Sequence, residues 1–523
     1  MKKKTLPLAI LVLLFLFLAN STSYTQITSK EVDNLVEDAL DQFNVAGAAV
    51  AIVKDGKIIH SKGYGVKSVV TKEKVDENTL FSIASNSKAF TTAALAILVE
   101  EGKISWTDKV VDHIPEFKMY NAYVTENFNI QDLLTHRSGL GLGIGDLMFF
   151  PDGSDFTIDD LLSNFQYFEP QSAFRTKFDY DNLLYLVAGE LIARKSGMSW
   201  EEFISTRIMN PLGMDNSHPS LSDIKDHGNL AAPHATTAGK LKPLPNYQEM
   251  INGAAAGIYS SVNDLSNWML MHLNNGKYGT DLEYHLFNNK SQNEMWKIHT
   301  SLNVNRDTRY NSHFAGYGLG WRLKDILGNM SVSHTGGMPG MLSKTIMIPD
   351  MNLGIVVLTN TDPGGAALFT AVSQTILDSY LDLDDFGWVD KYSRLLKQKQ
   401  EYTDSIVNQV WETVENANDS YVKTDDYIGV YEDEWFGKLE VLKKGDQLWF
   451  KSHRSPKLNG PMRFYKANTY VIKWEYQDMN ADAFAMFSLD ENGKAQCIKM
   501  KGISPDIDFS FDFQDLNPKR IND

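Results

Sequence analysis

The sequence predicts an α+β fold, with an antiparallel sheet flanked by helices, followed by an all-β C-terminal domain. Two hairpin patterns, over residues 45–61 and 343–359, predict the sheet because each joins apolar runs across a short turn. Helical spacing of apolar residues predicts helices that start at Ser85, Asp181 and Asp264. Such helices bury their apolar stripe against a sheet, which is the α+β arrangement.

The chain has 523 residues, which is too long for one ordinary core and indicates more than one domain. We expect an α+β domain over residues 29–384, a connector with one or two exposed helices over 385–424, and a β-rich domain over 425–523. The connector is polar with sparse apolar positions, whereas the last segment has the pattern of strands joined by turns. A barrel-like closure would spare that segment bare sheet edges.

Residues 1–25 have the pattern of a signal peptide. Three lysines at positions 2–4 precede an apolar run over residues 6–19, which is short for a membrane span, and a polar stretch follows. The pattern predicts a secreted or periplasmic protein, with an uncleaved membrane anchor as the alternative. Cys497 is the single cysteine of the sequence, so no internal disulfide is possible.

Composition and motif content argue against several function classes. The net charge is −16 and no basic stripe is visible, so nucleic acid is not an expected partner. The sequence contains no G-x-G-x-x-G, P-loop or H-E-x-x-H motif, and its 12 histidines lack ligand spacing. We therefore expect no cofactor and no metal. A small molecule or a peptide is the expected substrate, and the oligomeric state stays open.

The most informative pattern is Ser85-x-x-Lys88, which lies directly before a long apolar run. A serine hydroxyl needs a base within hydrogen-bond reach to act as a nucleophile. Residues three apart share one face of a helix, so Lys88 can approach Ser85. Free backbone N–H groups and the positive end of the helix dipole would favour an oxyanion beside Ser85. A solvated helix surface is the ordinary explanation of an isolated match.

Two further patterns place polar groups where they can meet this serine. Tyr180-x-Asn182 stands at a turn that opens a helix, so both polar tips can point into one cleft, although a half-buried tyrosine and a capping asparagine would give the same pattern. Residues 334–337, His-Thr-Gly-Gly, follow a strand pattern and predict an edge strand that another backbone can approach closely. A substrate can pair with such an edge, and a plain glycine-rich turn is the alternative.

Taken together and in this order, Ser85-x-x-Lys88, Tyr180-x-Asn182 and His334-Thr335-Gly336 resemble the active-site motifs of the penicillin-recognising serine hydrolases, in the class C β-lactamase branch. Further stretches are similar to recurrent segments of that family, and they lie at residues 133–140, 211–214, 256–264, 317–321 and 356–360. The resemblance implies a sheet in which the first and last strands pair. It also implies that the β-rich tail is the small barrel-like domain often appended to these hydrolases.

The resemblance also implies roles for the motif residues. Ser85 would attack a carbonyl, and Lys88 and Tyr180 would share the role of base, without a choice between them from sequence. Asn182 would hold a substrate amide. The backbone N–H groups of Ser85 and Gly337 would form the oxyanion hole.

One position departs from the family pattern, because His334 stands where the family usually has a lysine. His334, Thr335 and Gly336 would bind substrate, with the imidazole either a cation for a carboxylate or a neutral structural ring. Arg175 is a spare cation near the tyrosine motif, although a surface arginine is the commoner explanation.

The expected function is an exported serine hydrolase that forms an acyl-enzyme with a small amide or ester. A D-amino-acid-containing peptide is the first expectation, a carboxylic ester the second and a β-lactam the third. The competing class is a non-catalytic cell-wall or peptide binder with the same fold. No catalytic set is visible in residues 425–523, so we expect this tail to supply none of the groups proposed above.

Overall fold

The computed structural model describes residues 26–237, 239–248, 251–304, 309–418 and 423–521. The signal peptide expected at residues 1–25 lies outside these ranges. Within them, no helix combines the length and the apolar content that crossing a membrane requires.

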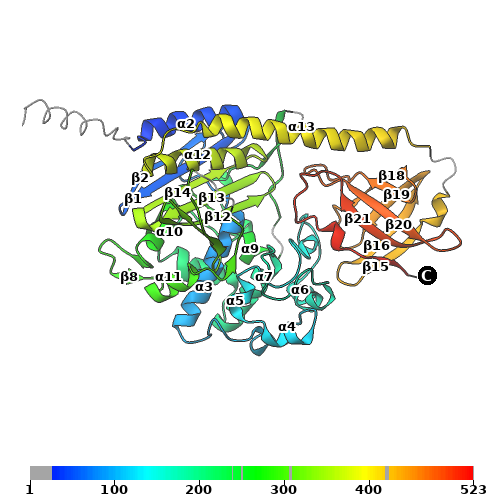
Figure 1. The fold of residues 1–523 in the computed structure, drawn as a ribbon, viewed down its shortest axis with the longest axis horizontal. Helices are drawn as coiled ribbons and strands as arrows, with labels where there is room; N and C mark the ends of the chain where they lie inside the picture. The colour runs from blue at the N-terminus through cyan, green and yellow to red at the C-terminus, as the bar shows by residue number, and fades with distance from the viewer. Residues whose placement is uncertain (1–25, 238, 249–250, 305–308, 419–422, 522–523) are drawn as a thin grey trace, which may run out of the picture.

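An eight-stranded antiparallel sheet forms the centre of the larger part of the molecule (Figure 1). Its strands, in spatial order, are β2 (Lys57–Gly65), β1 (Gly47–Lys54), β14 (Leu353–Thr359), β13 (Met341–Ile348), β12 (Asn329–Met338), β11 (Arg322–Ile326), β10 (Ala315–Tyr317) and β9 (Thr300–Ser301). Strands β1 and β14 pair with Val50 opposite Val357. The expected pairing of the first and last strands is therefore confirmed.

Helices cover both faces of this sheet, and strand β1 shows why. Its alternate residues Ala48, Val50 and Ile52 belong to one buried cluster, while Ala49 and Val53 belong to another on the opposite face. Helices α2 (Ser29–Phe43) and α12 (Gly364–Tyr380) pack in the first cluster, and α3 (Ser87–Glu100) and α10 (Val262–Leu273) pack in the second. A strand buried on both faces reads as a continuous apolar run, as residues 45–53 do.

A helical lobe lies beside the sheet and carries α7, which begins directly after the tyrosine motif (Figure 1). Helix α7 spans Leu183–Ser196. The remaining helices of this part are short, and they are α4 (Ala122–Asn127), α5 (Ile130–Leu133), α6 (Ile158–Asn164), α8 (Trp200–Ile204), α9 (Gly253–Ala256) and α11 (Asn289–Met295). Helix α3 lies between the lobe and the sheet and packs against α7 and α9.

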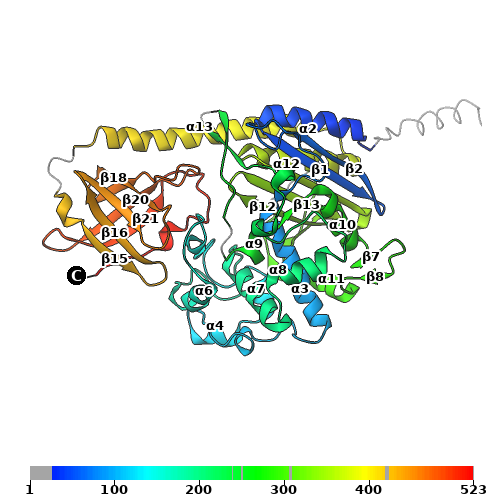
Figure 2. The same cartoon turned by 180° about the vertical axis from the view of Figure 1, so that it is seen from behind.

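A single helix, α13 (Trp388–Glu415), connects the two parts of the molecule. Figures 1 and 2 show from opposite sides that it runs along α2 and α12 and on to the C-terminal part. Trp388 near its start is buried in the cluster that also contains α2 and α12, while Val410 and Val414 near its end pack with Val471 of the β-rich part. The helix therefore contacts both parts along its length.

The C-terminal part is a closed antiparallel barrel. Strand β22 pairs with both β15 and β21, and this closes the ring so that the barrel has no bare edge. Its strands are β15 (Gly429–Asp433), β16 (Gly437–Lys444), β17 (Gln447–Ser452), β18 (Asn459–Lys466), β19 (Thr469–Ile472), β20 (Ala483–Leu489), β21 (Ala495–Gly502) and β22 (Lys519–Arg520). The predicted α+β fold with a barrel-like C-terminal domain is confirmed.

Strand β12 differs from the edge strand that the sequence suggested. It lies inside the sheet, between β13 and β11. Strand β11, however, pairs with it only as far as Ser333, whereas β13 pairs with it as far as Met338. Within the part of the chain that the structure describes, residues 334–338 thus have a strand partner on one side, and their other side faces the turn that carries Ser85.

Candidate active site

Ser85 lies in a 3₁₀ turn, Ala84–Asn86, between strand β3 (Phe81–Ser82) and helix α3. Helix α3 therefore begins at Ser87, slightly later than the sequence suggested. Ala84 has φ of +46°, a left-handed conformation that a residue with a Cβ adopts only under strain. The strained turn presents Ser85 at the wall of a pocket of about 290 Å³.

Lys88 follows on the first turn of α3, with its side chain buried. Its Nζ donates to Ser85 Oγ at 3.0 Å, to Asn182 Oδ1 at 2.7 Å and to the backbone oxygen of Ala255 at 3.0 Å. Burial lowers the pKa of Lys88 to about 7, and the carboxyls of Asp146 and Asp181 oppose this shift. About half of the amine is therefore neutral at pH 7 and able to accept a proton.

Asn182 is the residue before α7, and its side chain does not cap that helix. It instead accepts from Lys88 and donates through Nδ2 to Asp146 Oδ2 at 2.7 Å. Tyr180 lines the same pocket, and Lys88 Nζ lies 4.9 Å from the centre of its ring. The structure thus brings together both sequence patterns, although they stand far apart in the chain.

Burial raises the pKa of Tyr180 well above its ordinary value, and the nearby Ser85 hydroxyl only partly opposes this. The phenol is therefore protonated at neutral pH. His136, which has no role from sequence alone, lies against it with ring centres 4.2 Å apart and the ring planes tilted by 31°. Its Nδ1 accepts from the backbone N–H of Asp181 at 3.0 Å, and burial holds its pKa well below the ordinary value, so the ring is neutral.

His334 is buried and does not meet Tyr180 through a hydrogen bond that the structure records. Its Nδ1 lies 2.6 Å from the carbonyl oxygen of Thr335, which can only accept, so Nδ1 carries the proton. Its Nε2 then accepts from the Tyr317 hydroxyl at 2.9 Å. Burial, together with the charges of Lys88 and Arg322, lowers the pKa of His334 to about 3. Of the two expectations for this ring, the geometry favours the neutral one.

Gly336 lets strand β12 approach the serine turn. A Cβ on this residue would lie 2.1 Å from the backbone oxygen of Ile83 and 2.9 Å from the backbone nitrogen of Ser85. The close approach expected from the small residues of this motif is thus present. Thr335 and Gly337 line the pocket together with Ser85.

The cation of the pocket is Arg322, which sequence reasoning missed. It lies at the start of β11 among the lining residues, with its guanidinium 5.4 Å from the ring centre of Phe178. Arg175, the spare cation expected from sequence, instead forms an ion pair with Asp132 at 2.5 Å and is not among the lining residues. The pairing of β11 with β12 is what places Arg322 near His334, and no local motif signals this.

The barrel also contributes to the pocket wall, which the sequence did not indicate, although it supplies none of the motif groups proposed from sequence. Asp508, Phe509 and Ser510 line it beside Ser85 and Asn182. These residues follow β21, in the segment that leads to β22. The rest of the lining is largely apolar and includes Leu142, Phe149, Phe150, Phe178 and Met338.

Comparisons with known proteins agree with this architecture. The family model for beta-lactamases matches residues 32–374, and a domain of unknown function, DUF3471, matches residues 418–520. A protein named unguisins hydrolase ungD', from Aspergillus campestris, is 27% identical over 427 residues, which cover 78% of this chain and 76% of that protein. Protein flp of Staphylococcus aureus is 26% identical over 350 residues, covering 65% of this chain and 64% of that protein.

Solved structures show the same fold at low identity. The octameric penicillin-binding protein homologue from Pyrococcus abyssi has a TM-score of 0.59 at 20% identity, covering 94% of this chain and all of that one. A class C beta-lactamase has a TM-score of 0.54 at 21% identity, covering 66% of this chain and 95% of that one. Because the family match extends over more than half of its length, the chain belongs to the Beta-lactamase family of serine hydrolases.

Proposed function

We propose that the protein is an exported serine hydrolase that forms an acyl-enzyme on Ser85 with a small amide or ester. The observation that carries this proposal is the contact between Ser85 Oγ and Lys88 Nζ, 3.0 Å apart, with the amine pKa lowered to about 7. A serine beside a neutral amine has the base that nucleophilic attack requires. Export rests on the signal-peptide pattern of residues 1–25.

In the proposed reaction Ser85 Oγ attacks the substrate carbonyl and its proton passes to Lys88 Nζ. Lys88 is a better base than Tyr180, because the phenol has a raised pKa and keeps its proton at neutral pH. The backbone N–H groups of Ser85 and Gly337 would receive the oxyanion. Loss of one such donor typically costs about 10²–10³ in rate.

The bond to the leaving group then breaks as a proton reaches the departing nitrogen or oxygen. Tyr180 is suited to deliver this proton, since its hydroxyl stays protonated, it lines the same pocket as Ser85 and its ring adjoins Lys88. Lys88 would return the proton to Tyr180. Water then hydrolyses the ester on Ser85 by the reverse sequence of proton transfers, and Asn182 would hold a substrate amide.

A peptide that contains a D-amino acid is the substrate class we propose first. His334 stands where the family usually has lysine, and members of the family with histidine at this place include peptidases that act on D-amino acids. Arg322 supports the choice, because this cation in the pocket wall can receive a peptide carboxylate in place of the missing lysine. A volume of about 290 Å³ suits a small substrate.

A carboxylic ester is the second candidate, and the apolar lining by Phe149, Phe150 and Met338 favours it. A β-lactam comes third, because the neutral ring of His334 replaces the permanent cation of that position. A non-catalytic binder would need neither the Lys88 amine nor its contact with Ser85.

The test is labelling with a fluorophosphonate, which reacts with an activated serine. Wild type should label at one site and Ser85→Ala should not, at equal melting temperature, because the variant loses only a hydroxyl. The first substrate class is supported if the wild type labels and also hydrolyses D-aminoacyl chromogenic substrates faster than matched esters and cephalosporins. A folded wild type that resists the probe contradicts the acyl-enzyme, and equal labelling of Ser85→Ala contradicts the choice of nucleophile.

A further inference from the structure

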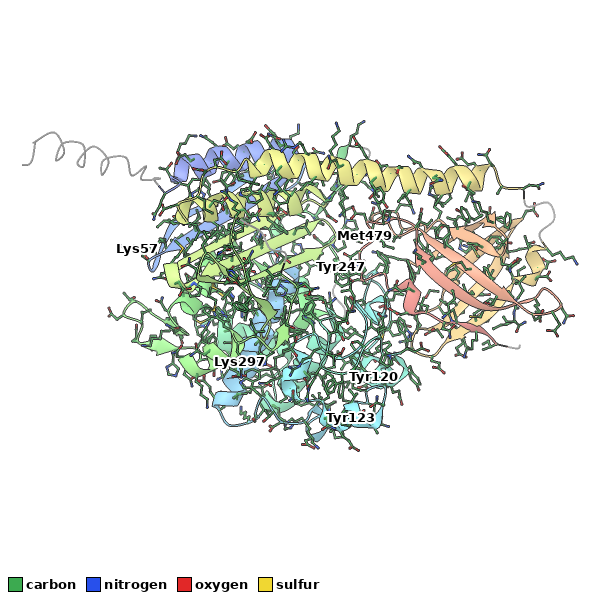
Figure 3. All side chains as sticks on the ribbon, viewed as in Figure 1. Lys57, Tyr120, Tyr123, Tyr247, Lys297 and Met479 are labelled. Carbon is green, nitrogen blue, oxygen red and sulfur yellow. The ribbon has the colours of Figure 1, made fainter. Side chains whose placement is uncertain are left out.

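The barrel meets the α+β domain at the wall of the active-site pocket. The ring of Phe509 lies edge-on to Tyr180, with ring centres 5.9 Å apart. Gly143 makes this approach possible, because a Cβ there would lie 2.7 Å from the Phe509 ring. Figure 3 shows Tyr247 and Met479 at the junction of the two domains, and the Tyr247 hydroxyl donates to the backbone oxygen of Phe149 in the pocket wall.

Ser510 of the barrel enters the hydrogen-bond network that ends at Ser85. Its Oγ donates to Asp146 Oδ2 at 2.8 Å, and the same carboxylate oxygen accepts from Asn182 Nδ2 at 2.7 Å. Asn182 Oδ1 in turn accepts from Lys88, which donates to Ser85. A continuous chain of hydrogen bonds thus joins a side chain of one domain to the candidate nucleophile of the other.

The barrel also holds the backbone on both sides of Asp146. The carboxylate of Asp512 accepts from the N–H of Gly145 at 2.6 Å and from the N–H of Leu147 at 3.0 Å. Both Asp146 and Asp512 are fully buried. Ion pairs farther from the pocket, such as Lys457 with Asp152 at 2.6 Å, add to the contact between the domains.

This arrangement sets the orientation of the Asn182 amide. Asp146 Oδ2 accepts from both Ser510 and Asn182, so it binds the NH₂ side of the amide and leaves the carbonyl side for Lys88. With the amide reversed, its NH₂ would face the Lys88 amine and lose that contact. Ser510 donates to the same oxygen, and this hydrogen bond fixes the carboxyl oxygen that meets the amide.

We propose that the barrel domain completes the active site, with Ser510 and Asp512 as positioning residues that hold Asp146 and, through it, Asn182 and Lys88. The inference rests on the proposed acyl-enzyme function and deepens it. It assigns a role to the domain whose family carries no known function.

The test compares the full-length Ser510→Ala and Ser504→Ala variants in the second-order rate of fluorophosphonate labelling. Both remove a buried hydroxyl from the same segment, but Ser504 Oγ accepts only from the backbone of Asp506 among the bonds recorded. Rates are measured well below the melting temperature of every variant. We expect Ser510→Ala to label roughly 10- to 100-fold more slowly, because Asp146 loses a buried hydrogen-bond donor. Ser504→Ala should match wild type.

A double-mutant cycle with Asp146→Asn separates positioning from general stability. If Ser510 acts through Asp146, adding Ser510→Ala to Asp146→Asn slows labelling by less than about twofold beyond Asp146→Asn alone. The inference would be overturned if the rate losses of the two single variants multiplied in the double variant, or if Ser510→Ala labelled at the wild-type rate. Either result would leave the proposed acyl-enzyme function standing. Absence of labelling in wild type would instead refute the proposed function itself.

Discussion

If Lys88 is the base, the rate of acylation should follow the titration of its amine. The structure lowers the Lys88 pKa to about 7, so the neutral fraction is about one tenth at pH 6, half at pH 7 and nine tenths at pH 8. Only the neutral amine accepts a proton, so the rate should rise with pH, about fivefold from pH 6 to 7 and less than about twofold from pH 7 to 8.

The assay is the second-order rate of labelling of Ser85 by a neutral fluorophosphonate between pH 5.5 and 8.5. With a neutral probe, His136 and His334 add no pH dependence, because burial keeps both rings neutral across this range. Asp181, with a pKa raised to about 7, titrates nearby, so Asp181→Asn serves as the control and should keep a rising profile. A flat profile in wild type would refute Lys88 as the base.

The same lowered pKa has a consequence for stability. In the unfolded chain Lys88 has a pKa of about 10.5, so between about pH 7 and 10.5 the unfolded state binds the extra proton and wild-type stability rises with pH. Relative to Lys88→Met, which does not titrate, wild type should gain about 2 kcal/mol of unfolding free energy from pH 7 to 9. Urea unfolding of both proteins measures this gain, and a constant difference would contradict a titrating buried amine.

Two further predictions concern strand β12 and the pocket cation. Gly336→Ala should slow labelling roughly 10²–10³-fold, since its Cβ would overlap the Ile83 carbonyl and press on the Ser85 nitrogen. The control is Gly337→Ala, whose Cβ meets only the Leu342 side chain at 3.2 Å and which should slow labelling far less. Equal losses would show that the close approach is not the cause. Arg322→Leu should raise KM for carboxylate-bearing substrates about tenfold or more and leave their methyl esters unchanged, and a parallel change for both substrates would remove the carboxylate role.

Local spacing carried most of what could be predicted about the site. Ser85 and Lys88 are three residues apart at the start of a helix, and Tyr180 and Asn182 are two apart before another, so each pair was set by backbone geometry. The two hairpins, β1 with β2 and β13 with β14, were also visible because each joins its strands across a short turn. The choice between Lys88 and Tyr180 was not visible, because it depends on burial and neighbouring charge, which exist only after folding.

The groups that sequence reasoning missed share a different property, which is distance along the chain. Asp146 and Ser510 are 364 residues apart, and neither belongs to a sequence motif. From sequence alone, each would be taken for an ordinary surface residue. The position of Arg322 in the pocket wall depends on how β11 pairs with β12. Arg175, the cation expected from sequence, is instead held away from the pocket by its ion pair with Asp132. Motifs therefore located the reacting groups, while the residues that orient them came from the fold.

The buried charges around Lys88 explain why a second domain belongs at this site. A lysine amine and the carboxyls of Asp146 and Asp181 are all removed from water here, and burial opposes the charge on each of them. Asp146 Oδ1 and Asp181 Oδ2 are buried without a hydrogen-bond partner among the residues that the structure describes, so each donor that does reach the cluster matters for its geometry. Ser510 supplies a donor to Asp146, and Asp512 binds the backbone on both sides of it. The barrel thus provides from outside the α+β domain the contacts that hold a reactive, intrinsically destabilising site in one arrangement.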